Sequence, residues 1–219
     1  MHVNNNIIFT TKIVKTGEKH KIQGIEIISV IDGELFENQK GILKNFESSV
    51  YYQGDIEARK DSFICIISLN DNDIILNKVD INKKFGDYCR SNWNSGNNLF
   101  PGCGLENTDL YRSEQIEESF SGSKYKFNFR FCGPNTNCGI HNTHNFIEVH
   151  TNIAGDGFMQ KFDNQSEDSL VETVGLMPGN THKRFDMDGI YNKNNVPKYP
   201  YHRWLGGNSG NIWLAIEKY

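Results

Sequence analysis

Residues 125–132 alternate strictly between large apolar and smaller or polar side chains, and this pattern constrains the fold more than any other feature of the sequence. Four aromatic residues fill the odd-numbered positions, and Lys126, Asn128, Arg130 and Cys132 fill the even ones. Successive side chains of a β-strand point to opposite faces, so a period of two predicts a strand with one apolar face. A strand of this kind needs a sheet and a partner layer to bury that face.

Short runs rich in β-branched or aromatic residues recur along the chain, each bounded by Gly, Asn or Asp residues that favour turns. They cover residues 7–14, 22–31, 49–52, 63–69, 74–79, 145–153, 158–162, 171–177 and 212–216. The Asp32-Gly33 pair adds a hairpin signal. Two segments differ, because residues 35–46 predict one short helix and residues 114–120 a helical turn. Many short strands separated by turn signals predict an all-β sandwich or barrel.

The strand pattern breaks between residues 85 and 122, where Gly, Asn and Pro101 interrupt every apolar cluster. A long irregular segment is typical of a lid or a linker, and we expect it to pack over an open end of the barrel. It divides the chain into an N-terminal β-rich extension, 1–122, and a C-terminal region, 123–219. The 97 residues of that region barely suffice for a barrel. We therefore expect N-terminal strands to complete its sheets, with a second barrel half as the alternative.

Charge and cysteine content exclude several classes of protein. The net charge is −4 and no Lys/Arg-rich run is present, so nucleic acid is not an expected partner. The most apolar run, 63–69, is far shorter than the ~20 residues that cross a bilayer. Five cysteines at irregular spacing and no secretory signal argue against a disulfide framework. We expect a cytoplasmic protein with a small-molecule ligand and no membrane association. An exposed edge strand within the N-terminal 120 residues would suit a homodimer.

Histidine placement points to a metal site. Five of the seven histidines lie in the last 79 residues, and His141, His144 and His150 fall within ten positions together with Glu148. Neutral imidazole is the commonest metal ligand, and a carboxylate balances the charge of a divalent ion. His144 and Glu148 share one face of the predicted strand, so a further ligand must come from another strand. His2 and His20 are expected at the surface.

Two short patterns in this region resemble the motifs of the cupin superfamily. His144-x3-Glu148-x6-Gly155 matches the end of the first cupin motif in register, and Gly179-x2-His182 matches the middle of the second. The resemblance covers residues 131–185 and a closing strand at 211–216. It implies a cupin-like jelly-roll barrel that holds a divalent metal ion, Fe, Mn, Ni or Zn. The ligands that it implies are His141, His144, Glu148 and His182.

The sequence departs from the cupin pattern in ways that leave the ligand set open. Asn142 stands where the first motif has its first His. Either a one-residue bulge turns His141 inward, or the site lacks this ligand or uses Asn142 in its place. Pro178 is adjacent to Gly179, and Asp186 replaces the closing Asn of the second motif. His202 competes with His182 as the late ligand, because it follows Pro197-x4 and precedes a Gly-rich turn and a strand. We favour His182 for its more ordinary distance from the first motif.

A different metal site would combine Cys132, Cys138, His141 and His144 as a structural zinc knuckle. Two thiolates and two imidazoles suit zinc. The spacing is not one of the usual zinc-finger patterns, and the residues run directly into a strand. We therefore prefer the histidine–carboxylate site.

The cupin resemblance implies a metal-dependent enzyme that acts on a small polar molecule, as an oxygenase or as an isomerase or epimerase. Arg and Tyr side chains near the site are candidate anchors for a carboxylate or a hydroxyl, and Arg130 shares the strand face of Cys132. The predicted substrate-binding residues are His150, Arg184, Tyr201, His202 and Arg203. The alternative is a non-catalytic jelly-roll module that binds carbohydrate or serves a structural role, with Trp204, Trp213, Tyr199 and Tyr201 stacking on a sugar.

Overall fold

The computed structural model describes residues 3–5, 8–37, 40–59, 61–75, 79–96, 108–185, 192–194 and 196–219. Strands dominate these residues, which confirms the predicted all-β class. The described helices are α1 (Asp87–Asn92), a π-helical turn at Asn82–Gly86 that leads into it, and 3-10 turns at Asn72–Ile74 and Glu167–Ser169. Within the described ranges, none of the helices has the length and apolar character needed to span a membrane.

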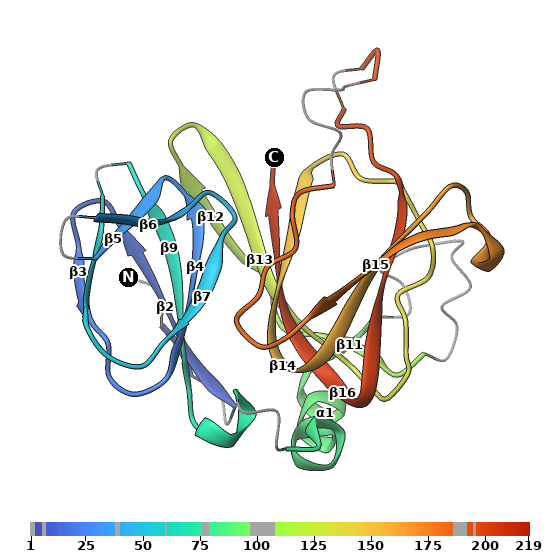
Figure 1. Cartoon of the computed structure of the whole chain (residues 1–219), viewed down its shortest axis with the longest axis horizontal. Coiled ribbons are helices and arrows are strands. Elements are labelled where there is room, and N and C mark those ends of the chain that lie inside the picture. The colour runs from blue at the N-terminus through green and yellow to red at the C-terminus, as the bar shows by residue number, and fades with distance from the viewer. Residues whose placement is uncertain are drawn as a thin grey trace.

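The described strands form three antiparallel sheets (Figure 1). The first holds, in spatial order, β1 (Val3–Asn5), β2 (Phe9–Lys15), β9 (Phe63–Leu69), β4 (Glu26–Asp32) and β7 (Ser48–Tyr51). The second holds β3 (Lys19–Lys21), β8 (Asp55–Ala58), β5 (Glu34–Glu37) and β6 (Lys40–Lys44). The third holds β10 (Asn94–Ser95), β11 (Leu110–Arg112), β13 (Ser123–Cys132), β16 (Tyr201–Lys218), β14 (Ile147–Phe162) and β15 (Leu170–Leu176), and β12 (Ile116–Phe120) also pairs with β13.

Three hydrophobic clusters separate these layers. One fills the space between the first and second sheets with side chains of β2, β4 and β9 on one side and of β5 and β8 on the other. A second packs the first sheet, through residues such as Phe9 and Phe63, against the aromatic face of β13 and its neighbours in the third sheet. A third cluster lies on the other face of the third sheet and includes Trp204 and Trp213. The candidate histidines lie on the side of this third cluster.

The third sheet folds over on itself because its two longest strands bend. In Figure 1, β16 descends on the right, turns at the bottom and rises to the C terminus at the centre. The β14–β16 register shifts twice, between Asn152 and Ala154 and between Gly155 and Gly157. Trp204 on one arm of β16 stacks on Trp213 on the other arm, with ring centroids 4.7 Å apart. The fold therefore encloses the inner face of β14.

The motif glycine Gly155 has a structural role at this bend. Its φ is +73°, a left-handed conformation that glycine adopts without strain. A Cβ atom at this position would lie 2.2 Å from the carbonyl oxygen of Gly210, so no larger residue fits. The second motif glycine, Gly179, also has positive φ, and a Cβ there would lie 2.4 Å from a methyl group of Val50. Both glycines of the motif resemblance are thus required by the backbone.

Several expected elements differ from the observed ones. The helix predicted at 35–46 is wrong, because β5 and β6 form a hairpin there and β5 also pairs with β8. The helical turn predicted at 114–120 is strand β12, which pairs along β13. The first residue of the strand predicted at 74–79, Ile74, is the last residue of a 3-10 turn. Residues 76–78 of that prediction lie outside the described residues. Partner strands, which a local pattern does not include, decide the first two cases.

The segment predicted to be irregular, 85–122, is mostly regular where it is described. It contains α1 and the strands β10, β11 and β12, and the last two pair with β13. Residues 97–107 lie outside the described residues. The strands up to Leu69 pair with one another in the described structure, and they contact the third sheet through the shared core. The division of the chain at 122/123 stays a prediction.

Candidate metal centre

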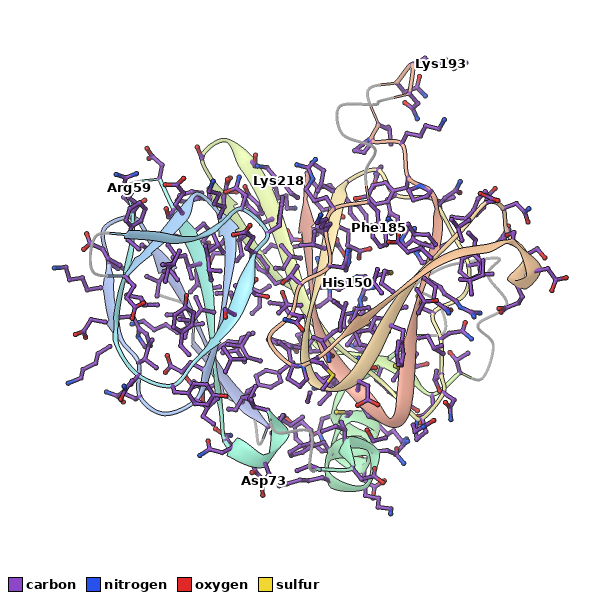
Figure 2. All side chains as sticks on the ribbon, viewed as in Figure 1. Arg59, Asp73, His150, Phe185, Lys193 and Lys218 are labelled. Atoms are coloured by element: carbon purple, nitrogen blue, oxygen red, sulfur yellow. The ribbon has the colours of Figure 1, made fainter. Side chains whose placement is uncertain are left out.

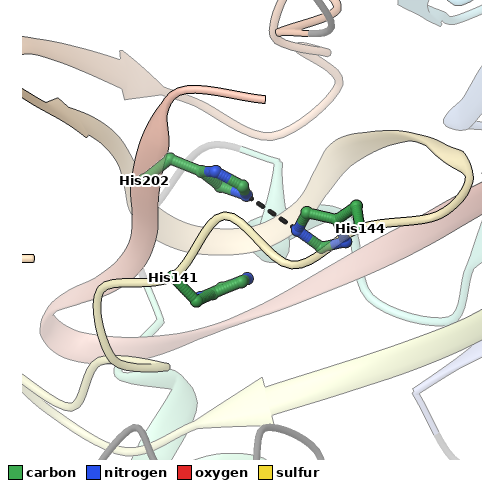
Figure 3. A group of neighbouring side chains, drawn as sticks. All are labelled: His141, His144 and His202. Atoms are coloured by element: carbon green, nitrogen blue, oxygen red, sulfur yellow. Dashed lines mark hydrogen bonds between the residues drawn. The ribbon is translucent and has the colours of Figure 1, made fainter. Parts of the chain in front are cut away.

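Three histidines converge inside the folded third sheet. His141 and His144 lie in the connection between β13 and β14, and His202 is the second residue of β16. One ring nitrogen of each falls within 4.8 Å of the others, and all three side chains are buried (Figure 3). Among the described residues, this is the one group of three or more His, Cys, Asp or Glu side chains that meets this geometric condition.

Backbone pairing places two of these histidines opposite each other. The N–H of His141 donates to the carbonyl of His202 at 3.0 Å, and the N–H of His202 donates to the carbonyl of His141 at 2.9 Å. His144 then approaches from the same connection, with its Nε2 3.1 Å from Nε2 of His202. The backbone pairing of His141 with His202 therefore places the His141 side chain in the group, and no bulge in β14 is needed. Asn142, which stands at the motif position of the first His, is half-buried.

Hydrogen bonds fix the tautomers of His141 and His202. The Nδ1 of His141 lies 2.9 Å from the carbonyl oxygen of Gly139, and the Nδ1 of His202 lies 3.0 Å from that of Pro200. A carbonyl oxygen only accepts, so Nδ1 carries the proton in both rings. The Nε2 atoms then present lone pairs toward the centre. Metal-binding histidines commonly have this arrangement, in which the second nitrogen donates to a carbonyl.

The environment keeps the three imidazoles neutral. Burial, followed by the neighbouring His144, lowers the pKa of His141 to about 4. Burial also lowers the pKa of His144, and burial together with the other two histidines holds the pKa of His202 well below its usual range. Burial disfavours the charged form of an imidazole. At neutral pH the group therefore offers neutral nitrogen donors, the form that binds a metal ion.

Glu148 lies beside the three histidines and is held by Arg130. Its Oε2 is 3.6 Å from Nε2 of His144, and its Oε1 is 3.2 Å from both a guanidinium nitrogen of Arg130 and Nε2 of His150. Arg130 also lies 3.4 Å from Glu217. Burial raises the pKa of Glu148, but the nearby imidazoles and the guanidinium outweigh it and hold that pKa well below its usual range. Glu148 is thus a buried anion next to the imidazoles.

His182, the favoured late ligand, does not join this group. Its Nδ1 lies 2.7 Å from the carbonyl of Lys183, and its Nε2 accepts the backbone N–H of His150 at 3.0 Å. Both nitrogens of the neutral ring are therefore engaged with the backbone, and burial lowers the pKa of His182 to about 3. The geometry favours His202, the alternative ligand. His182 instead ties the segment after β15 to the inner face of β14.

The predicted substrate-binding residues occupy different surroundings. His150 is buried inside the fold (Figure 2), edge-on to Trp204 at 5.4 Å, and its Nδ1 has no hydrogen-bond partner among the described residues. Arg203 binds Gln160 at 2.7 Å and pairs with Glu167. Arg184 is exposed and lies over the ring of Phe46. Of the predicted set, His202 belongs to the histidine group and His150 contacts Glu148 next to it. Tyr201 is half-buried at the start of β16.

The structure disfavours the two alternative sites. The Sγ of Cys132 donates to Asn211 at 2.8 Å and the Sγ of Cys138 accepts the N–H of Trp204 at 3.0 Å, and neither joins the histidines. A zinc knuckle is therefore not formed. The aromatic residues proposed for sugar stacking, Trp204, Trp213 and Tyr199, are at most 5% exposed and pack within the core.

Sequence reasoning missed the role of Tyr199. Its hydroxyl accepts the N–H of Glu148 at 2.7 Å, and its ring lies 4.8 Å from that of His144. Tyr199 therefore positions both residues from the segment that precedes β16. Its distance of three residues from His202 was the available signal, because groups that orient the ligands are part of a metal site.

No family model matches the sequence, and no curated protein does. Among solved structures, the chain is similar to a cupin 2 conserved barrel domain protein from Leptotrichia buccalis, with 10% identity, 97% of this chain and 85% of that chain covered, and a TM-score of 0.34. A Bacillus subtilis oxalate decarboxylase with Mn(II) centres gives 13% identity, coverage of 99% and 74%, and a TM-score of 0.35.

An oxalate oxidase in complex with glycolate shows 10% identity over 43% of this chain, with a TM-score of 0.31. This chain covers only 41% of the oxalate oxidase chain. In a separate comparison, it covers 58% of a cupin-2 domain from Rhodospirillum rubrum. The similar structures thus include cupins, as the sequence motifs suggested, but at these TM-scores the overlap carries no argument about chemistry. What the chain itself shows is an all-β fold with a buried histidine group inside a folded antiparallel sheet.

Proposed function

We propose that this chain binds a divalent transition-metal ion, Fe, Mn, Ni or Zn, through the Nε2 atoms of His141, His144 and His202. The observation that carries the proposal is the convergence of three buried imidazoles, two of which have their Nδ1 proton committed to a backbone carbonyl. Imidazole nitrogen suits each of these metals, so the donor set alone does not select one.

The charges around the histidines support a cation. Arg130 carries one positive charge between the two carboxylates Glu148 and Glu217, both buried. With both carboxylates ionised, these three side chains carry a net negative charge, and burial, followed by the proximity of Glu148, raises the pKa of Glu217 against that state. A divalent ion beside Glu148 would compensate that charge. We retain Glu148 as a fourth ligand or as the closest anion to the metal.

We further propose that the site acts on a small polar molecule. A divalent ion with three imidazole ligands keeps positions open for water or a substrate oxygen and polarises what binds there. Glu148 is placed to accept or return a proton near such a ligand, and His150 and Arg130 hold its carboxylate in place. An oxygenase or an isomerase reaction is compatible with this arrangement.

The first test is the metal content of the purified protein and of the His144→Ala variant. We expect about one ion per chain, removed by a chelator and restored by loading, and loss of binding in the variant. Loading with Co²⁺ then tests for an open position, because added azide should change the visible spectrum when a ligand position is free. A protein that takes up no metal under any loading condition would contradict the proposal. A Co²⁺ spectrum insensitive to azide would contradict the catalytic part alone.

A further inference from the structure

Three buried polar atoms on the inner face of the third sheet have no hydrogen-bond partner among the described residues. They are Nδ2 of Asn128, Nε1 of Trp213 and Nδ1 of His150, and these residues are at most 3% exposed. A buried polar group without a partner is costly, and in native folds it commonly marks a bound water, an ion or a functional role. None of the three atoms belongs to the histidine group that forms the proposed metal site.

The three residues surround one small residue, Ala215. In the register of the sheet, Ala215 of β16 pairs with Asn128 of β13 on one side and with His150 of β14 on the other. Neighbouring strands lie about 4.8 Å apart, so Asn128 and His150 are about 10 Å apart with only a methyl group between them. Trp213 is two positions before Ala215 and therefore shares its face. The Trp213 ring lies edge-on to that of His150, with centroids 6.2 Å apart.

Two of these atoms are donors and one is an acceptor. The Oδ1 of Asn128 accepts a hydrogen bond from Nε of Arg130 at 3.0 Å, which fixes the orientation of the amide and leaves its Nδ2 as a donor. An indole nitrogen only donates. Nε2 of His150 faces Oε1 of Glu148 at 3.2 Å. Because a carboxylate only accepts, the ring proton of His150 belongs on Nε2, and Nδ1 keeps its lone pair.

We propose that Asn128, His150 and Trp213 bind a hydroxyl group of the substrate over Ala215, and that the substrate is a small neutral hydroxylated molecule. A hydroxyl has one O–H donor and two acceptor lone pairs, which matches one acceptor and two donors. A carboxylate has no proton for His150, and an ammonium group has no lone pair for the two donors. The inference rests on the proposed function, because the bound molecule is the substrate of the metal site.

The surroundings of this hydroxyl subsite favour a neutral group. Arg130, which contacts Asn128, is already paired with the buried carboxylates Glu148 and Glu217. A substrate carboxylate at this place would add a third negative charge to one guanidinium. Glu148 also lies 3.6 Å from His144 of the metal site. The carboxylate of Glu148 therefore lies between the hydroxyl subsite and the proposed metal, where it contacts both.

The indole N–H signal of Trp213 in a proton–nitrogen NMR spectrum tests the inference directly. Glycerol, a small neutral polyol, should shift this signal downfield and saturably, with a dissociation constant on the order of millimolar. The signal of Trp93, which packs against a different core cluster, is the internal control and should not move. Malonate, a dianion of similar size without a hydroxyl, should leave the Trp213 signal unchanged. A shift with malonate and none with glycerol, or no saturable shift with either, would overturn the proposal.

Trp213→Phe and Trp204→Phe form a matched pair of variants. The two indoles stack on each other, but Nε1 of Trp204 already donates to Asn211 at 3.3 Å. Calorimetry should show glycerol binding weakened about fivefold or more in Trp213→Phe, from the loss of one hydrogen bond, and less than about twofold in Trp204→Phe. Equal weakening in the two variants would overturn the role of the Trp213 N–H.

Titrations of the zinc-loaded and the metal-free protein separate this inference from the proposed function. Metal uptake without glycerol binding would overturn the hydroxyl subsite and leave the metal site intact. Glycerol binding by a protein that takes up no metal would overturn the proposed function, and with it the role of the bound molecule as substrate. We expect the zinc-loaded protein to bind glycerol with the Trp213 signal shifted.

Discussion

Arg130 forms ion pairs with two buried carboxylates, one of which lies beside the three histidines. Its guanidinium lies between Glu148 and Glu217, and its Nε donates to Asn128 at 3.0 Å. The side chains of Arg130 and both carboxylates are at most 8% exposed. A buried carboxylate is costly unless it is paired. The position of Glu148 beside His144 therefore depends on a residue that is not one of the three histidines.

Replacing Arg130 by Met should destabilise the metal-free protein strongly. The substitution keeps most of the volume but leaves two buried carboxylates without their cation, and loss of one partner of a buried ion pair costs about 3–5 kcal/mol. Unfolding in urea measures the effect. Lys19→Met is the control, because its ion pair with Glu57 is exposed and is worth at most about 1 kcal/mol. Equal losses in the two variants would show that Arg130 is not needed to hold the carboxylates.

At this scale the sequence identified the region of the site but not all its ligands. His144 and Glu148 were predicted together, because a spacing of four places two residues on one face of a strand. The choice between His182 and His202 required the structure. Each follows a Gly or Pro pattern that fits the late part of a cupin motif, and they differ in whether the backbone of β14 occupies Nε2. That difference arises from tertiary packing, which spacing does not encode.

Among the elements, the bent strands β14 and β16 shape the site. Their bend brings His202 and Trp204, on one arm, over the part of β14 that carries Glu148 and His150. The alternating pattern of β13 was predictable because it belongs to one strand. The hairpin at 35–46 was not predictable from its own sequence. Residues 38–39, which join its strands in the chain, belong to a polar stretch, and β5 is stabilised by its pairing with β8. Strand pairing over long sequence distances decides such segments.

Gly155→Ala tests the bend in β14. Both the positive φ and the close carbonyl of Gly210 oppose a side chain, so we expect a loss of at least ~2 kcal/mol of stability. Gly122→Ala is the matched control: its φ is +81°, but a Cβ there would meet no atom within 4 Å. Its loss should be only ~1 kcal/mol, from backbone strain alone. Urea unfolding midpoints give both values, and equal losses would contradict the proposed close packing.

For the whole molecule, the shared core joins the N-terminal sheets to the third sheet. Asp32, at the end of β4, adds a polar link at this junction. Its carboxylate accepts a hydrogen bond from the hydroxyl of Tyr125 on β13 and lies 3.2 Å from Nζ of Lys218 on β16. The two parts of the chain are thus connected by both apolar packing and a charged contact.

This contact predicts a pH dependence of stability. Burial raises the pKa of Asp32, but the hydrogen bonds from Tyr125 and Lys218 outweigh it, and the pKa is lowered overall. A lowered pKa stabilises the fold above the unfolded value of ~3.9, and the effect is lost as the pH falls through the folded value. Asp32→Asn should therefore be less stable than the unsubstituted protein at pH 7, with the difference shrinking below about pH 4. A difference that does not change with pH would contradict this role.

The central claim is that His202, and not His182, completes the metal centre with His141 and His144. The most direct test is the metal stoichiometry of His202→Ala and His182→Ala, measured in parallel after identical loading, with thermal unfolding to confirm that both variants fold. We predict that His202→Ala loses the metal and that His182→Ala retains it, because the nitrogens of His182 bind the backbone. Retention of metal in His202→Ala together with its loss in His182→Ala would contradict the account.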